Sequence, residues 1–117
     1  MSWTDEEAAL RAIGPTRGGG WIAEEAVAMS LYCVMRRPLD YCAAVRLAAN
    51  ISGDSDSVAS MTGGIQGARL GTSAIPAEWL ARLENRDYIT DVADRLAGKK
   101  AQNTVAAAQA VAAGGAS

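Results

Sequence analysis

The sequence has 117 residues, enough for one domain at most, and a formal net charge of −2. Hydrophobic residues make up 50% of it, but much of that is alanine, and the aromatic residues are three Trp and three Tyr with no Phe. This composition has no basic patch that would indicate nucleic-acid binding, and no apolar run reaches the roughly 18 residues of a membrane span.

The chain begins with a predicted short helix. Thr4 and Glu7 have the spacing of a capping box, in which the residue at the N-cap and the residue three positions later satisfy each other's backbone N–H groups. We expect this helix to end near Ile13, because Gly14 and Pro15 follow.

Two amphipathic helices are predicted next. Apolar residues recur at helical spacing over residues 21–36, and Pro38 closes that segment because the residue before a proline avoids helical angles. Residues 39–51 form a second such segment, for which Asp40 is the candidate N-cap.

Three further helices are predicted in the second half of the sequence. One covers residues 56–70, one has Pro76 in its first turn, and one follows Asp87 as its N-cap and ends at Gly98. With no alternating strand pattern anywhere, the predicted fold class is all-α, a helical bundle over residues 1–98. Residues 99–117 are rich in Ala and Gly, and we expect either disorder or a frayed alanine helix there.

Glycines recur every four positions in the predicted helix over residues 56–70, at Gly63, Gly67 and Gly71. Each glycine inside a helix costs roughly 1 kcal/mol relative to alanine, so we expect close packing against a neighbouring backbone to offset it. This spacing predicts a central helix that holds its own N-terminus rigidly.

Two aspartates, Asp54 and Asp56, lie at that N-terminus with serines after each of them. Helix capping explains one such residue, since a side-chain oxygen can accept from the free N–H groups of the first turn. Two neighbouring carboxylates repel each other, and a hard cation such as Mg²⁺ or Mn²⁺ would relieve the repulsion. A calcium loop does not fit, because Ala59 and Ile65 stand where such a loop needs Gly and Glu.

Other candidate residues carry weaker signals. Gly20 ends a glycine run that can line a phosphate, Trp21 can stack at the rim of a pocket, and Ser55 lies within the acidic block. Their alternative interpretations are an ordinary loop and a tryptophan that packs at the start of a helix. Cys33 and Cys42, with no His in the chain, provide neither a zinc site nor a disulfide framework. Because the N-terminus is acidic and unlike a signal peptide, we expect a cytoplasmic protein.

Three sequence blocks together resemble the ADP-ribosylglycohydrolase family, which includes dinitrogenase-reductase-activating glycohydrolase and the crystallin J1-like proteins. The blocks are GGGWIAEEAVAMSLYCVM, AVRLAANISGDSDSVASMTGGIQGARLG and AIPAEWLARLENRDYITDVADRLAG, which cover roughly residues 18–98. Their order and spacing match the C-terminal part of that family, and the Asp-x-Asp-Ser block is the most specific of their features.

The resemblance implies metal-dependent hydrolysis of ADP-ribosyl glycosidic bonds on an all-α fold with a dinuclear Mg²⁺ or Mn²⁺ centre. Asp54, Asp56 and Ser57 match the family's C-terminal metal ligands, although Ser57 stands where Thr is common and Ser52 replaces a glycine. The implied substrates are an ADP-ribosylated protein or a small ADP-ribosyl compound.

The family's other metal ligands, a Thr-Asp-Asp block, and its acid/base carboxylate have no match in this sequence. We therefore expect the chain alone to be inactive and to require a missing N-terminal half or self-association. The alternative is a truncated, non-catalytic helical interaction module.

Overall fold

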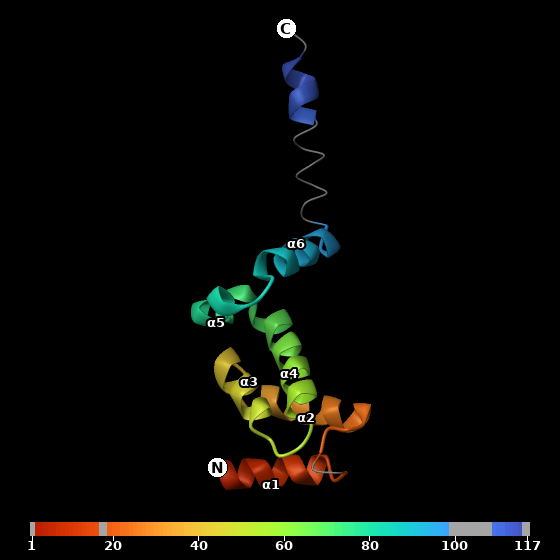
Figure 1. Cartoon of the computed structure of the whole chain (residues 1–117), viewed down its shortest axis with the longest axis vertical. Helices are drawn as coiled ribbons and strands as arrows, with labels where there is room; N and C mark the ends of the chain where they lie inside the picture. Colours follow the sequence, from red (N-terminus) through yellow and green to blue (C-terminus); the bar gives the residue numbers. More distant parts are fainter. Residues whose placement is uncertain (1, 17–18, 99–108, 116–117) are drawn as a thin grey trace. The chain divides into compact units, whose positions relative to one another are not determined.

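The computed structural model describes residues 2–16, 19–98 and 109–115, and within these ranges the only regular structure is helical (Figure 1). The helices are α1 (Trp3–Ile13), α2 (Ala23–Arg36), α3 (Tyr41–Ala49), α4 (Ser55–Leu70), the 3₁₀ helix η1 (Thr72–Ala74), α5 (Ala77–Arg82) and α6 (Arg86–Leu96). A further helical stretch covers residues 109–114. The prediction of an all-α chain is confirmed. None of the helices in the described ranges has the length and apolar character needed to cross a membrane.

The chain divides into two compact units, residues 1–76 and residues 77–117. The first contains α1 to α4 and η1, and the second contains α5 and α6. The predicted domain end at residue 98 adjoins residues 99–108, which lie outside the described residues, so that boundary stays a prediction.

Helix α4 is the central element of the first unit, because it packs against both α2 and α3. Its buried residues Val58, Thr62 and Gln66 are spaced four apart and therefore form one stripe along the helix. The core around them is made mainly of medium-sized and small side chains: Leu10, Ala26, Met29, Cys33, Leu47, Ala48, Ile51 and Val58.

Close approach along α4 is concentrated at one glycine. A Cβ atom at Gly63 would lie 3.1 Å from the hydroxyl oxygen of Tyr41, whereas one at Gly67 would lie 4.0 Å from the Tyr41 ring. At Gly64 and Gly71 a Cβ would meet nothing within 4 Å among the described residues. The predicted glycine stripe is therefore a close contact with α3 at Gly63 only.

The first helix begins two residues earlier than predicted. Ser2 is the N-cap of α1, and the capping box pairs it with Asp5, whose Oδ2 accepts from the Ser2 N–H at 2.9 Å. The prediction of Thr4 and Glu7 as the box was wrong, because Ser2 and Asp5 have the same three-residue spacing and flank the true first turn. Glu7 instead accepts from the Ser52 hydroxyl at 2.7 Å.

The predicted caps of the later helices have mixed outcomes. Asp40 caps α3 as predicted, and its Oδ1 accepts from the Ala43 N–H at 2.8 Å. Asp87 is not the cap of α6; Asn85, in the left-handed region with a φ of 56°, precedes that helix and puts Asp87 in its first turn. Gly98 follows the end of α6 with a φ of 72°, a conformation that favours glycine.

A buried ion pair joins α1 to the end of α2. Glu6 is only 2% exposed, and its two carboxylate oxygens accept from both terminal nitrogens of Arg37, at 2.9 and 3.0 Å. Arg36 adds a third contact at 3.3 Å. Burial acts to raise the pKa of Glu6, but the hydrogen bonds and charges of Arg37 and Arg36 outweigh burial and lower it. These two arginines therefore hold α1 against the end of α2.

Candidate functional site

The acidic block at the start of α4 is held in place from two sides. The Asp54 N–H donates to the backbone oxygen of Gly19 at 2.9 Å, which joins the block to the loop before α2. Two residues earlier, the Ser52 hydroxyl donates to Glu7 and joins the same turn to α1. Residues far apart in the sequence thus fix where α4 begins.

Gly20 lies directly against this block. A Cβ atom there would come within 3.0 Å of Val58 Cγ2 and 3.4 Å of Asp54 Cβ, so the loop backbone approaches α4 as closely as a glycine allows. Gly19 and Gly20 both have positive φ angles, 99° and 85°, which L-residues with a Cβ rarely adopt. The structure therefore brings together Gly20 and Asp54, which the sequence identified separately.

The two aspartates do not act as a simple helix cap. Asp54 occupies the N-cap position of α4, but its side chain makes no capping hydrogen bond. A side-chain hydrogen bond from Asp54, followed by the backbone N–H groups of Asp56 and Ser57, lowers the pKa of Asp56. Asp56 therefore keeps its negative charge at the start of α4, where a cation would be stabilised.

The donor chemistry fits part of a divalent metal centre. Carboxylate and hydroxyl oxygens are the ligands that Mg²⁺ and Mn²⁺ prefer, and Asp54, Asp56 and Ser57 supply them within one helical turn. Over the described residues, however, no group of three or more His, Cys, Asp or Glu side chains is arranged to hold a metal ion. These residues can therefore hold an ion only with further oxygens from water or from another source.

Two predicted site residues remain, Trp21 next to Gly20 and Ser55 within the acidic block. Trp21 is 59% exposed and immediately follows Gly20, just before α2 begins. Ser55 is the first residue of α4, and its N–H donates to the Gly53 carbonyl at 2.8 Å.

One further residue, Glu25, is not identified from the sequence. It is only 6% exposed, although it lies in the first turn of α2, where glutamates are usually solvated. Its carboxylate accepts from the Thr16 N–H, the Thr16 hydroxyl and the Gly20 N–H, at 3.2, 2.6 and 3.2 Å. The sequence feature that could have indicated this role is the glycine-rich loop just before Glu25, because the N–H groups of such a loop need an acceptor.

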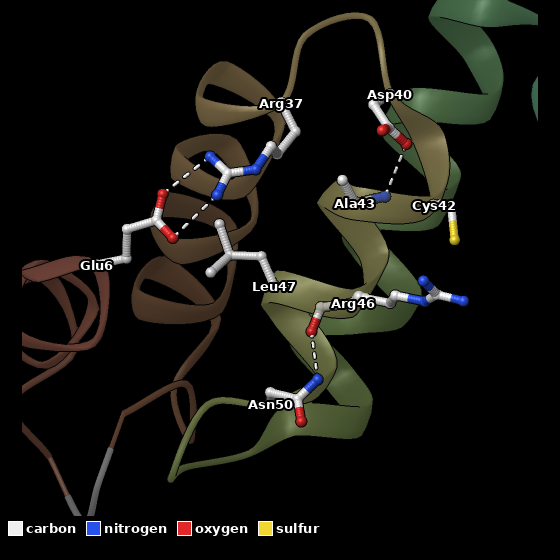
Figure 2. A pocket seen from close by; sticks show the side chains of 8 residues that line it. All are labelled: Glu6, Arg37, Asp40, Cys42, Ala43, Arg46, Leu47 and Asn50. Atoms are coloured by element: carbon white, nitrogen blue, oxygen red, sulfur yellow. Dashed lines mark hydrogen bonds and ion pairs between the residues drawn. The ribbon is translucent and has the colours of Figure 1, made fainter. Parts of the chain in front are cut away.

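A hollow of about 460 Å³ lies elsewhere in the first unit, and its lining includes none of the predicted site residues (Figure 2). The residues that line it come from α1, the end of α2 and α3: Glu6, Arg37, Asp40, Cys42, Ala43, Arg46, Leu47 and Asn50. Its polar groups already serve the fold, since Glu6 pairs with Arg37, Asp40 caps α3 and the Asn50 amide donates to the Arg46 carbonyl at 2.7 Å. We therefore do not place the chemistry here.

Most of the chain matches one known protein family. A family model described as ADP-ribosylglycohydrolase matches residues 2–106. A protein named ADP-ribosylarginine hydrolase Tri1 from Serratia proteamaculans is 47% identical over 53 residues, which are 45% of this chain and 14% of that protein. A Pseudomonas putida protein of the same name is 40% identical over 53 residues, with the same coverage.

A third relative, an uncharacterized protein of Archaeoglobus fulgidus, is 41% identical over 49 residues, which are 42% of this chain and 15% of that protein. No solved structure matches. The chain thus spans only a small part of the length of the curated relatives that it matches.

Proposed function

The chain belongs to the ADP-ribosylglycohydrolase family, and from that premise we propose that it supplies one side of a metal centre for the hydrolysis of ADP-ribosyl glycosidic bonds. The observation that carries this proposal is the pair Asp54 and Asp56, held against the loop at Gly20. A capping role alone does not account for a second carboxyl group beside Asp54, whose own side chain makes no capping hydrogen bond.

In this proposal Asp54, Asp56 and Ser57 hold Mg²⁺ or Mn²⁺ through oxygen atoms. The ions, when bound, would polarise ribose and water oxygens at neutral pH, which is chemistry that needs no histidine. Gly20, Trp21 and Ser55 would border the substrate, because Gly20 and Ser55 lie at the N-terminal end of α4 and Trp21 follows Gly20 in the chain.

The proposed substrate carries an ADP-ribosyl group on a protein side chain or a small acceptor. Two of the relatives are named ADP-ribosylarginine hydrolases, which makes arginine the first acceptor to test. The arrangement of Asp54 and Asp56 does not select the acceptor, because in this proposal they hold the metal that binds the ribose side of the glycosidic bond.

We propose that the centre is completed by groups that this chain does not supply. Hard cations need about six oxygen ligands, and two carboxylates with one hydroxyl give about half of these. A companion polypeptide with further carboxylates, or a second copy of the chain, would add them together with the acid or base. We expect this to occur in the cytoplasm.

A second candidate is a non-catalytic helical interaction module. The observation that favours it is an apolar stripe on α2, formed by Val27, Leu31 and Met35 at four-residue spacing and 41%, 45% and 77% exposed. Such a stripe is suited to packing against another helix.

The test is release of ADP-ribose from an ADP-ribosylarginine peptide in the presence of Mn²⁺. The chain is assayed alone and with a separately produced polypeptide that carries the remainder of the Serratia relative. We expect release only from the mixture, and a loss of at least about 10-fold in the Asp56→Asn variant. Asp87→Asn is the matched control, because Asp87 is also an acid in the first turn of a helix.

Release by the chain alone that survives Asp56→Asn would contradict the proposed metal site. Formation of a stable complex between the two polypeptides without any release would favour the interaction module.

A further inference from the structure

We propose that Glu25 is a positioning residue of the acidic block: its buried carboxylate fixes the loop that in turn fixes Asp54. This inference rests on the proposed function, because it assigns Glu25 a role in metal binding at Asp54 and Asp56. Glu25 does not itself touch the proposed metal.

The first step of the argument is the contact between Glu25 and the loop before α2. One carboxylate oxygen accepts from the Thr16 N–H, and the other accepts from the Thr16 hydroxyl and the Gly20 N–H. These bonds satisfy two backbone N–H groups at opposite ends of the loop with one side chain. A neutral amide cannot replace this arrangement, since its NH₂ group donates and does not accept.

The second step is the contact between the loop and α4. The Gly19 carbonyl accepts from the Asp54 N–H at 2.9 Å, and a Cβ atom at Gly20 would lie 3.4 Å from Asp54 Cβ. Because Gly19 and Gly20 have the conformational freedom of glycine at positive φ, something outside them must hold their geometry. Glu25 does so, and displacement of the loop would move the backbone from which Asp54 extends.

The third step is the comparison of Glu25 with its neighbour. Glu24 occupies the same first turn of α2 but is exposed, so it satisfies the ordinary preference of a helix N-terminus for negative charge. Burying the second carboxylate has a desolvation cost, which the three donors offset. The buried position of Glu25 is therefore explained by the loop and not by the helix.

The experiment measures Mn²⁺ affinity by calorimetry and the melting temperature for four proteins: the wild-type chain and the variants Glu25→Gln, Glu24→Gln and Glu6→Gln. We expect Glu25→Gln to weaken Mn²⁺ binding by at least about 10-fold, as is common when a group that orients a metal ligand is lost. Glu24→Gln controls for the loss of charge in the same turn. Glu6→Gln controls for the loss of a buried carboxylate, because Glu6 contacts the opposite end of α2. Both controls should bind within about twofold of wild type at temperatures where they are folded.

A milder variant keeps the proposal testable if Glu25→Gln does not fold. Thr16→Val removes only the hydroxyl donor of an exposed loop residue, and we expect a loss of Mn²⁺ affinity of about 2- to 5-fold with little change in melting temperature. Wild-type affinity in both Glu25→Gln and Thr16→Val would overturn the role of Glu25 while leaving the proposed function standing. Absence of Mn²⁺ binding by the wild-type chain, both alone and mixed with the companion polypeptide, would overturn both.

Discussion

Substituting Gly20 by alanine tests directly whether the loop is held against α4 as closely as the structure indicates. The new Cβ would lie 3.0 Å from Val58 Cγ2, and Val58 is fully buried, so it has little room to move. The backbone φ of 85° adds roughly 1–2 kcal/mol of strain for any residue with a Cβ. Overpacking against the core adds about 1–3 kcal/mol, which gives an expected loss of about 2–5 kcal/mol in the free energy of unfolding.

The assay is urea denaturation followed by circular dichroism at 222 nm. A loss of 3 kcal/mol would lower the urea midpoint by about 1–3 M, given an m-value of about 1–3 kcal/mol/M. Gly64→Ala is the matched control, because Gly64 is helical with nothing within 4 Å of the new Cβ among the described residues. This control should gain up to about 1 kcal/mol from helix propensity.

Mn²⁺ affinity can be measured for the same two variants, in addition to their stability. Gly20→Ala should also weaken Mn²⁺ binding where the protein remains folded, because the loop cannot keep its contact with Asp54. An unchanged urea midpoint in Gly20→Ala would refute the close approach of the loop to Val58, and with it the reasoning that positions the acidic block.

Arg37→Met should lower the free energy of unfolding by about 3–5 kcal/mol, because it leaves the buried Glu6 without its bidentate partner; urea denaturation at pH 7 measures the loss. The pKa of Glu6 is lowered in the folded protein, so its ionised carboxylate stabilises the fold above the pKa of the unfolded chain, and this stabilisation is lost as the pH falls through the pKa of the folded protein. The difference in free energy of unfolding between wild type and Glu6→Gln should therefore shrink below about pH 4. Burial raises the pKa of the Cys33 thiol to about 11. At pH 8 a disulfide reagent should therefore modify the half-buried Cys42 first and react with Cys33 only after urea is added. Equal rates of modification of the two cysteines in the native protein would contradict this. Asp40→Ala should cost about 1 kcal/mol through loss of the α3 cap, measured as a lower melting temperature.

The helices could be predicted from the sequence because their signals are local. Periodic apolar positions and the Gly and Pro residues between them gave α2, α3 and α4 within one or two residues of their observed ends. The capping box of α1 was misassigned because Ser2–Asp5 and Thr4–Glu7 have identical spacing. In the structure Glu7 instead accepts from Ser52, 45 residues away, a contact that local spacing does not indicate.

The candidate site residues can be recognised from the local sequence, whereas the distant residues that contact them cannot. The two aspartates stand out locally, since one cap needs only one carboxylate. Their attachment to Gly19 and Gly20 depends on a hydrogen bond between residues 35 positions apart, which no spacing rule reveals. From its position in the first turn of α2, Glu25 has the sequence pattern of an exposed acid that interacts with the helix dipole. Its burial depends on contacts with Thr16 and Gly20, which local sequence does not indicate.

The most direct test of the proposed metal centre locates bound Mn²⁺ by its paramagnetic effect on the amide resonances of the ¹⁵N-labelled chain. Substoichiometric Mn²⁺ should broaden the amides of residues 54–58 and of Gly20 first, with Mg²⁺ as the diamagnetic control, and Asp56→Asn should abolish this local effect. Broadening that spreads evenly over exposed acids, or that centres on α6 and persists in Asp56→Asn, would contradict the assignment of Asp54, Asp56 and Ser57 as metal ligands.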